Sequence, residues 1–149
     1  MMLDGAAHPN SANRRSYMLG VIANAQIEAG QLEAAFGNLE SALTESKTLG
    51  TASYDAEIIR LQGRCLLMQA GTGVETVEER YRLALDIARK QGAKSFEVRS
   101  ATDLARFLRD QGKLTDARDL LRPVYDRFTE GFDTLDLKQA KALLDELAL

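Results

Sequence analysis

The chain of 149 residues is 45% hydrophobic and 28% charged, with a formal net charge of -3, which suits one domain with its own core and gives no footprint for direct nucleic-acid binding. It has neither a run of about 18 apolar residues nor a secretory leader, so we expect a cytoplasmic protein that does not enter a membrane. One cysteine, Cys65, and one histidine, His8, are too few for a disulfide framework or a usual zinc site, and we expect no metal and no cofactor.

Helical periodicity runs through almost the whole chain, with no alternating pattern long enough for a sheet. A polar lead-in over residues 1–14, which contains Pro9, is expected to be flexible. The predicted helices follow near residues 15–28, 32–48, 53–69, 75–90, 94–110, 114–128 and 134–147. Pro123 falls inside the sixth of these helices, where we expect a kink or an early end.

The strongest signal is internal repetition. In EAGQLEAAFGNLESAL (28–43) and RDQGKLTDARDLLRPVY (109–125), a glycine is followed by a leucine two residues later and an alanine five residues later. Gly30, Gly71 and Gly112 stand 41 residues apart, and a second pair of glycines, Gly50 and Gly92, stands 42 apart. Such periods predict consecutive supersecondary units, each of two helices here. A glycine just after a helix is typical of a left-handed residue that ends it.

These residues resemble the tetratricopeptide repeats, whose units are helical hairpins with a glycine before the second helix and alanines where the two helices touch. The resemblance implies an all-α, right-handed α-solenoid of about three hairpins, with a period of about 41 residues, over residues 15–130. The longer units, and stretches such as YRLALDIARKQGAKSFEVRSATDLARFLRDQGK (81–113), resemble the C-terminal tails of bacterial predicted ATPases fused to adenylate/guanylate cyclase or LuxR-type regulatory domains.

The first predicted helix is apolar around nearly its whole circumference. A helix of this kind is normally covered on all sides, but at the end of a row of hairpins one side has only the polar lead-in beside it. We therefore expect self-association into a homodimer through this helix, over the residues Tyr17, Leu19, Val21 and Ile22.

Three arginines and a threonine share one stripe of the fifth predicted helix, namely Arg99, Thr102, Arg106 and Arg109. The resemblance implies that this stripe faces a concave groove, lined by the first helices of the hairpins, that holds partner peptides. Alignment on the repeat glycines puts three more residues in similar positions, namely Asn24, Arg60 and Arg64. Arginine donates two parallel hydrogen bonds to a carboxylate, so the expected partner is a protein or an acidic peptide. The alternative is a solvated face neutralised by Asp103 and Asp110.

Residues 131–149 restart the helical pattern after Gly131 and are interpreted as a C-terminal capping helix, since a row of hairpins needs a terminal element with a polar outer side. Asp133 or Thr134 would supply the N-cap oxygen, and Asp136 puts a negative charge in the first turn. One apolar stripe would face the hairpins, namely Leu137, Ala140, Leu144 and Leu147. The alternative is a helix that tethers another domain.

The sequence contains no recognisable catalytic motif. GTGVET (71–76) lacks the Gly-Lys-Ser/Thr that would hold phosphates. The carboxylates are interpreted as side chains on solvated helix faces. We therefore predict no catalytic residue and no enzyme activity. The expected function is a non-catalytic protein–protein interaction scaffold, as the C-terminal repeat module of a larger signalling or transcription-regulating protein. The alternative is a helical domain that senses an effector or small molecule and regulates a fused or partner cyclase or ATPase.

Overall fold

The computed structural model describes residues 9–148 and is helical through most of that range. Its α-helices are α1 (Pro9–Glu28), α2 (Leu32–Leu49), α3 (Asp55–Met68), α4 (Val74–Gln91), α5 (Lys94–Asp110), α6 (Leu114–Asp126) and α7 (Leu135–Leu147). A short 3-10 helix, η1 (Ala52–Tyr54), precedes α3. No strand occurs in the described range, and the predicted all-α class is confirmed.

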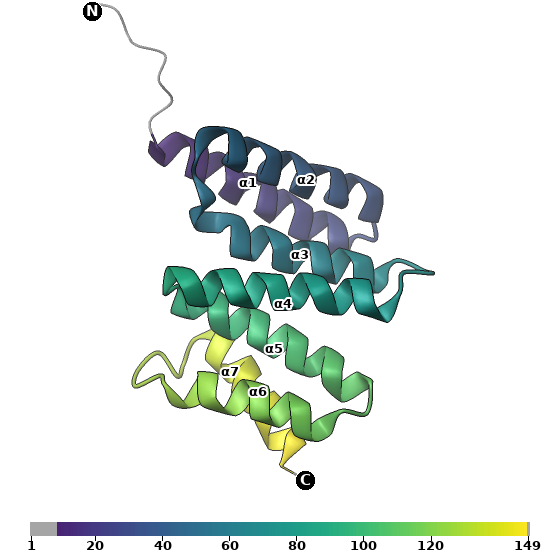
Figure 1. Cartoon of the computed structure of the whole chain (residues 1–149), viewed down its shortest axis with the longest axis vertical. Helices are drawn as coiled ribbons and strands as arrows, with labels where there is room; N and C mark the ends of the chain where they lie inside the picture. The colour runs from purple at the N-terminus through teal and green to yellow at the C-terminus, as the bar shows by residue number, and fades with distance from the viewer. Residues whose placement is uncertain (1–8, 149) are drawn as a thin grey trace, which may run out of the picture.

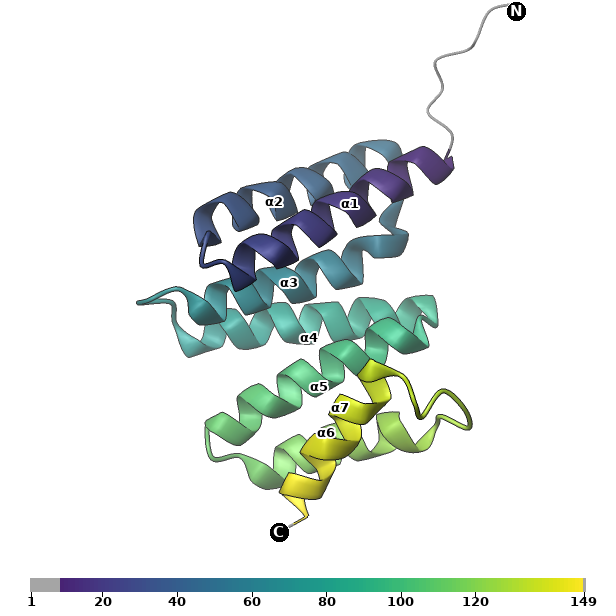
Figure 2. The same cartoon turned by 180° about the vertical axis from the view of Figure 1, so that it is seen from behind.

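The helices form three consecutive pairs, α1 with α2, α3 with α4 and α5 with α6. The pairs lie in a row, with α1 and α2 at one end (Figure 1). Because α3 contacts both α1 and α5, the first helices of the pairs join into one face (Figure 2). At the other end of the row, α7 lies across α5 and α6 and contacts both.

Glycines lie in the turn between the two helices of each pair. Gly30, Gly71 and Gly112 have φ angles of 78°, 84° and 81°, in the left-handed region that glycine enters without a Cβ penalty. In the last of these turns, the N–H of Lys113 reaches back to the carbonyl of Leu108 at 2.9 Å. The chain therefore reverses within a few residues, which brings the second helix of each pair against the first.

Helix boundaries differ from prediction mainly at the N-terminal end. α1 begins at Pro9 and not near residue 15, so the predicted start of this helix is wrong. Proline tolerates the first position of a helix because its missing N–H needs no partner there. The rest of the lead-in, with His8, lies outside the described residues. α6 contains Pro123 and ends at Asp126, two residues before the predicted end, as expected where proline removes a backbone donor.

Two buried apolar clusters hold the helices together. The N-terminal core, formed by α1, α2 and α3, contains Ala23, Ile27, Ala35, Leu39, Ala42, Ile58, Leu61 and Cys65. The C-terminal core, formed by α4 to α7, takes five residues from α7, namely Leu137, Ala140, Leu143, Leu144 and Leu147. The inner stripe predicted for this last helix is therefore confirmed.

The start of α7 also matches the prediction made from the sequence. Thr134 is its N-cap residue, and its Oγ1 accepts a hydrogen bond from the N–H of Leu137 at 3.5 Å. Asp136 lies in the first turn, where the helix dipole favours a negative charge. Among residues 9–148, no helix combines the length and apolar character that crossing a membrane requires.

Candidate binding groove

A groove of about 430 Å³ opens on the face formed by α1, α3, α5 and α7. Its lining residues are Asn24, Glu28, Arg60, Arg64, Arg99, Thr102, Asp103, Arg106, Leu135, Asp136 and Gln139. Six of the seven residues predicted for the partner-binding groove are among them. The structure therefore brings together side chains that the repeat alignment selected from three separate helices.

Arg60 is the centre of an ion-pair network at the base of the groove. Its Nη1 donates to Asp103 Oδ2 at 2.7 Å, and its Nε donates to Glu57 Oε1 at 3.1 Å. Burial alone would lower the pKa of Arg60, but the hydrogen bonds and charges of Glu57 and Asp103 raise that pKa above its usual value. The side chain is only 13% exposed, so its donors are used mainly within the protein.

Glu57 is a buried carboxylate that the sequence analysis missed. The residue is 3% exposed, and its Oε1 accepts from Arg60 and lies 3.5 Å from Arg99 Nη1. Its Oε2 is buried without a donor among the described residues. A buried carboxylate needs compensating positive charge, so Glu57 engages two groove arginines at once. Its position three residues before Arg60 is the spacing of an ion pair along a helix, and that signal could have revealed it.

Arg99 joins α5 to α7. Its Nε donates to Asp136 Oδ2 at 2.9 Å, and its guanidinium carbon lies 5.7 Å from the centre of the Phe96 ring. Burial lowers the pKa of Arg99, while Glu57 and Asp136 together raise it above its usual value. The sequence predicted Asp136 only as a favourable charge at the start of a helix, because it gives no sign of contacts between residues so far apart.

Arg64 and Arg106 are the groove arginines with the least compensated charge. Arg64 Nη1 donates to Asn24 Oδ1, a neutral acceptor, at 2.7 Å, and no carboxylate among residues 9–148 forms an ion pair with it. Arg106 Nη1 donates to Asp103 Oδ1 at 3.0 Å, but Asp103 also pairs with Arg60, and the Arg106 side chain is 41% exposed. These two guanidinium groups therefore keep donors that a ligand can use.

Two predicted groove residues have other roles. Thr102 is 3% exposed and donates to the carbonyl of Val98 at 2.7 Å, so its hydroxyl is satisfied within α5. Arg109 is not among the lining residues, which corrects its predicted place. It lies in the last turn of α5, where its Nε donates to Asp110 at 3.0 Å and its guanidinium pairs with Glu146 of α7.

The residues predicted for self-association divide between two sides of α1. Tyr17, Val21 and Ile22 are 54%, 51% and 45% exposed. Leu19 is half-buried and packs against the N-terminal core, which corrects its place on the open side. Met18, which the sequence analysis missed, is 55% exposed beside Tyr17.

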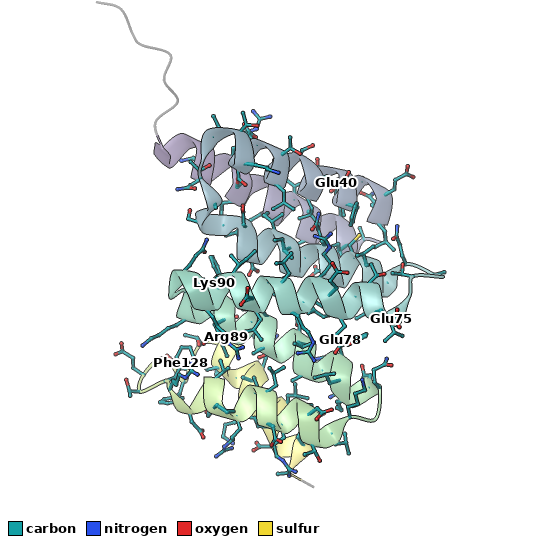
Figure 3. The ribbon with its side chains drawn as sticks, in the orientation of Figure 1. Glu40, Glu75, Glu78, Arg89, Lys90 and Phe128 are labelled. Atoms are coloured by element: carbon teal, nitrogen blue, oxygen red, sulfur yellow. The ribbon has the colours of Figure 1, made fainter. Side chains whose placement is uncertain are left out.

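The opposite face of the molecule differs from the groove. Figure 3 shows Glu40 on α2 and Glu78 and Lys90 on α4, so side chains of both charges project from the second helices of the pairs. A smaller hollow of about 180 Å³ is lined by Glu97, Arg89 and Arg127. There the carboxylate of Glu97 lies 3.1 Å from Arg127 Nη1 and 3.9 Å from Arg89 Nε, so both arginines already share a carboxylate partner. We therefore take the groove formed by α1, α3, α5 and α7 as the candidate site.

Within residues 9–148, no three His, Cys, Asp or Glu side chains are grouped so that they could hold a metal ion. No family model matches the chain, and no curated protein matches its sequence. The function therefore has to follow from the geometry and charge of the groove.

Proposed function

We propose that this chain is a non-catalytic protein–protein interaction scaffold that binds an acidic segment of a partner protein in the groove. The observation that carries the proposal is the grouping of Asn24, Arg64 and Arg106, from three different helices, around one hollow of about 430 Å³. Arginine donates paired, charge-assisted hydrogen bonds to carboxylates. A groove with two incompletely compensated arginines therefore selects acidic side chains.

The proposed architecture is a right-handed α-solenoid of three tetratricopeptide-like hairpins, with a period of about 41 residues and a cap formed by residues 131–149. Three helix pairs in a row, with left-handed glycines in corresponding turns, support it. In such a fold the first helices face a shared groove, and α1, α3 and α5 supply most of the lining here. In this proposal the chain is the cytoplasmic C-terminal repeat module of a larger signalling or transcription-regulating protein.

The arginines of the groove, and the nearby Tyr81, are suited to binding and not to proton transfer. Arginine remains charged throughout the physiological pH range, so the groove arginines cannot act as acids or bases. Tyr81 lies near them, but burial and the charge of Asp103 raise the pKa of its hydroxyl above the usual value. A general acid or base needs a pKa near the working pH, which neither kind of group offers.

Replacing Arg64 and Arg106 by glutamine tests the groove. The R64Q/R106Q double variant keeps long, hydrogen-bonding side chains but removes both charges. Each lost charge-assisted hydrogen bond is worth about 1.5–3 kcal/mol, so binding of a fluorescein-labelled peptide rich in Asp and Glu should weaken at least about tenfold. Circular dichroism should show unchanged helicity, because the ion pairs of Arg60 and Arg99 that join the helices stay in place.

Arg82→Gln combined with Arg122→Gln is the matched control. Both arginines lie on second helices, α4 and α6, and pair with carboxylates of their own helix. This control should bind the peptide as the wild type does. Equal weakening in both double variants would show that the effect comes from the net charge alone and not from the groove. Undiminished binding by R64Q/R106Q would refute the proposal.

A second candidate function is an effector-sensing domain that holds a small anion in the same groove and regulates a fused or partner cyclase or ATPase. The size of the groove favours it, because about 430 Å³ falls within the range of roughly 300–1,000 Å³ typical of small-ligand sites. Calorimetric titration with a panel of small dicarboxylates separates the two functions. A dicarboxylate that requires Arg64 and displaces the acidic peptide would favour the sensor.

A further inference from the structure

The outer side of α1 carries an apolar stripe that the described part of the chain leaves about half exposed, with only the Tyr17 ring meeting the edge of another ring, that of Tyr54, at a centroid distance of 5.6 Å. Tyr17, Met18, Val21 and Ile22 share one side of the helix and are 54%, 55%, 51% and 45% exposed. Ala25, also exposed, continues the stripe by another turn. The opposite side of α1 packs against α2 and α3. α1 is therefore apolar on two opposite sides, and a helix of that kind is normally covered on both.

Charges of opposite sign lie at the two ends of this stripe. Arg14 lies at its N-terminal end and Glu28, which also lines the edge of the groove, at its C-terminal end, and both are exposed. Neither forms an ion pair within residues 9–148, whereas the neighbouring Arg15 pairs with Glu45 at 2.8 Å. Arg14 and Glu28 each stand seven residues from Val21, so the two charges are symmetric about the middle of the stripe.

We propose that the chain forms a homodimer in which the α1 helices of two copies pack antiparallel, with Val21 at the two-fold axis. This arrangement places Arg14 of one copy beside Glu28 of the partner subunit, twice over, as an isologous interface requires. A parallel pair would instead bring like charges together. The stripe is therefore complementary to itself in both apolar character and charge, which identifies a second copy as its occupant.

The exposed area suits a reversible dimer. Roughly half of each of four large side chains is open, which amounts to about 400 Å² of apolar surface per copy. About 800 Å² of apolar surface over two copies, enlarged by the flanking polar residues, lies in the range of weak, transient interfaces, which bury less than about 1,200 Å² in total. We therefore expect a dissociation constant in the micromolar range and not a permanent dimer.

Sedimentation analysis of the full chain tests the dimer over about 1–200 µM, a range that brackets weak specific association. The wild type should change from monomer to dimer mass across this range. Val21→Asp should raise the dissociation constant at least about tenfold, because an unpaired carboxylate resists burial. Leu114→Asp is the matched control, since Leu114 is 50% exposed on α6 and lies outside the stripe. A wild type that stays monomeric, or a Val21→Asp variant that dimerises like the control, would overturn the proposal.

Single introduced cysteines test the antiparallel register, since the native Cys65 is buried. Val21→Cys places two thiols at the axis and should give a disulfide-linked dimer on mild oxidation. Ala25→Cys should not, because its two copies would lie about 12 Å apart along the paired helices. Cross-linking at both positions would indicate parallel helices and overturn the arrangement.

Exchanging the charges tests the ion pairs. Arg14→Glu and Glu28→Arg should each weaken the dimer several-fold, and the double variant should recover it because the pair is restored with reversed polarity. Absence of recovery would overturn the proposed pairing. Binding of a monomeric wild type to anionic lipid vesicles, lost in Val21→Asp, would assign the stripe to a membrane surface and overturn the dimer.

Discussion

The two ends of the molecule close in different ways. At the C-terminal end, α7 buries Leu137 and Leu144 on its inner side and turns Lys138 and Lys141 outward. At the N-terminal end, α1 also buries one side but leaves Val21 and its apolar neighbours exposed on the other. An end helix closes a row of hairpins only if its outer side is polar. By that criterion α7 has the character of a cap, and α1 has the character of an unfinished interface.

The apolar cores next to these two ends also differ, in the size of their buried residues. The C-terminal core contains the rings of Tyr81 and Phe107, whose centroids lie 6.2 Å apart, together with the large residues of α7. Half of the buried residues in the N-terminal core are small, namely Ala23, Ala35, Ala42 and Cys65. Small residues bring helices close together but remove less apolar area from water. The N-terminal end therefore has more to gain from a second copy than the C-terminal end.

Truncation of one large side chain at each end should reveal the difference between the two ends most clearly. Leu144 is 4% exposed within the C-terminal core, and Leu144→Ala should cost about 2–5 kcal/mol through lost burial and the cavity left behind. Ile22 is 45% exposed on α1, and Ile22→Ala should change the stability of the monomer by less than about 0.5 kcal/mol. Urea denaturation at low protein concentration measures both. Similar costs would mean that the two ends are closed alike.

A pair of glycine substitutions compares the middle of the row with its N-terminal end. A Cβ on Gly63 would lie 2.7 Å from the buried ring of Tyr81, whereas a Cβ on Gly37 of α2 would meet nothing within 4 Å. Gly63→Ala should destabilise the protein by about 1–2 kcal/mol, because overpacking outweighs the gain in helix propensity. Gly37→Ala should stabilise it by about 0.5–1 kcal/mol for the propensity alone.

Thermal or urea unfolding of both glycine variants gives the sign of each change. The contrast depends on Tyr81 being held in place by Phe107. A neutral or stabilising Gly63→Ala would therefore show that the ring moves aside, and that α3 and α4 are less tightly packed than the structure indicates.

The helices and much of the groove lining could be predicted because both follow from local patterns. Apolar residues three and four apart specify a helix and its inner side, as Leu137 and Leu144 do for α7. Repeated glycines mark equivalent turns, so alignment on them brings Asn24, Arg64 and Arg106 into register although they lie on different helices. Similar spacing from corresponding glycines is thus enough to gather these residues from distant parts of the chain.

The pairing of the groove charges could not be predicted from those patterns. Arg60 and Asp103 are 43 residues apart, and Arg99 and Asp136 are 37 apart, so their contacts depend on how α3, α5 and α7 pack. An arginine on a helix face has the same sequence pattern whether it meets solvent, a ligand or a carboxylate on another helix. For this reason the sequence could list the groove arginines but could not tell Arg64 from the internally paired Arg60.

Asp55 offers the smallest and most specific test of how the N-terminal end is attached. It begins α3, where the first helix pair meets the second, and its Oδ1 accepts a hydrogen bond from Ser46 Oγ at 2.7 Å. Burial raises the pKa of Asp55 above its ordinary value of 3.8, although the bond from Ser46 opposes this. The folded chain therefore holds this proton more tightly than the unfolded chain. As the pH rises from 3.8 through the raised pKa, the folded state loses stability.

Asp55→Asn removes that loss. Relative to the wild type, the variant should gain stability between about pH 3 and pH 7. The gain should stay below about 1 kcal/mol, because solvent screens a partly buried carboxylate. Urea midpoints across this pH range measure the trend, with Asp119→Asn on the exposed side of α6 as the control for removing one negative charge. A difference in stability between Asp55→Asn and wild type that is independent of pH would contradict the predicted effect of the raised pKa of Asp55. A trend specific to Asp55 would mean that the N-terminal pair is attached through a partly desolvated carboxylate, whereas Arg99 and Asp136 attach the C-terminal helix through a compensated ion pair.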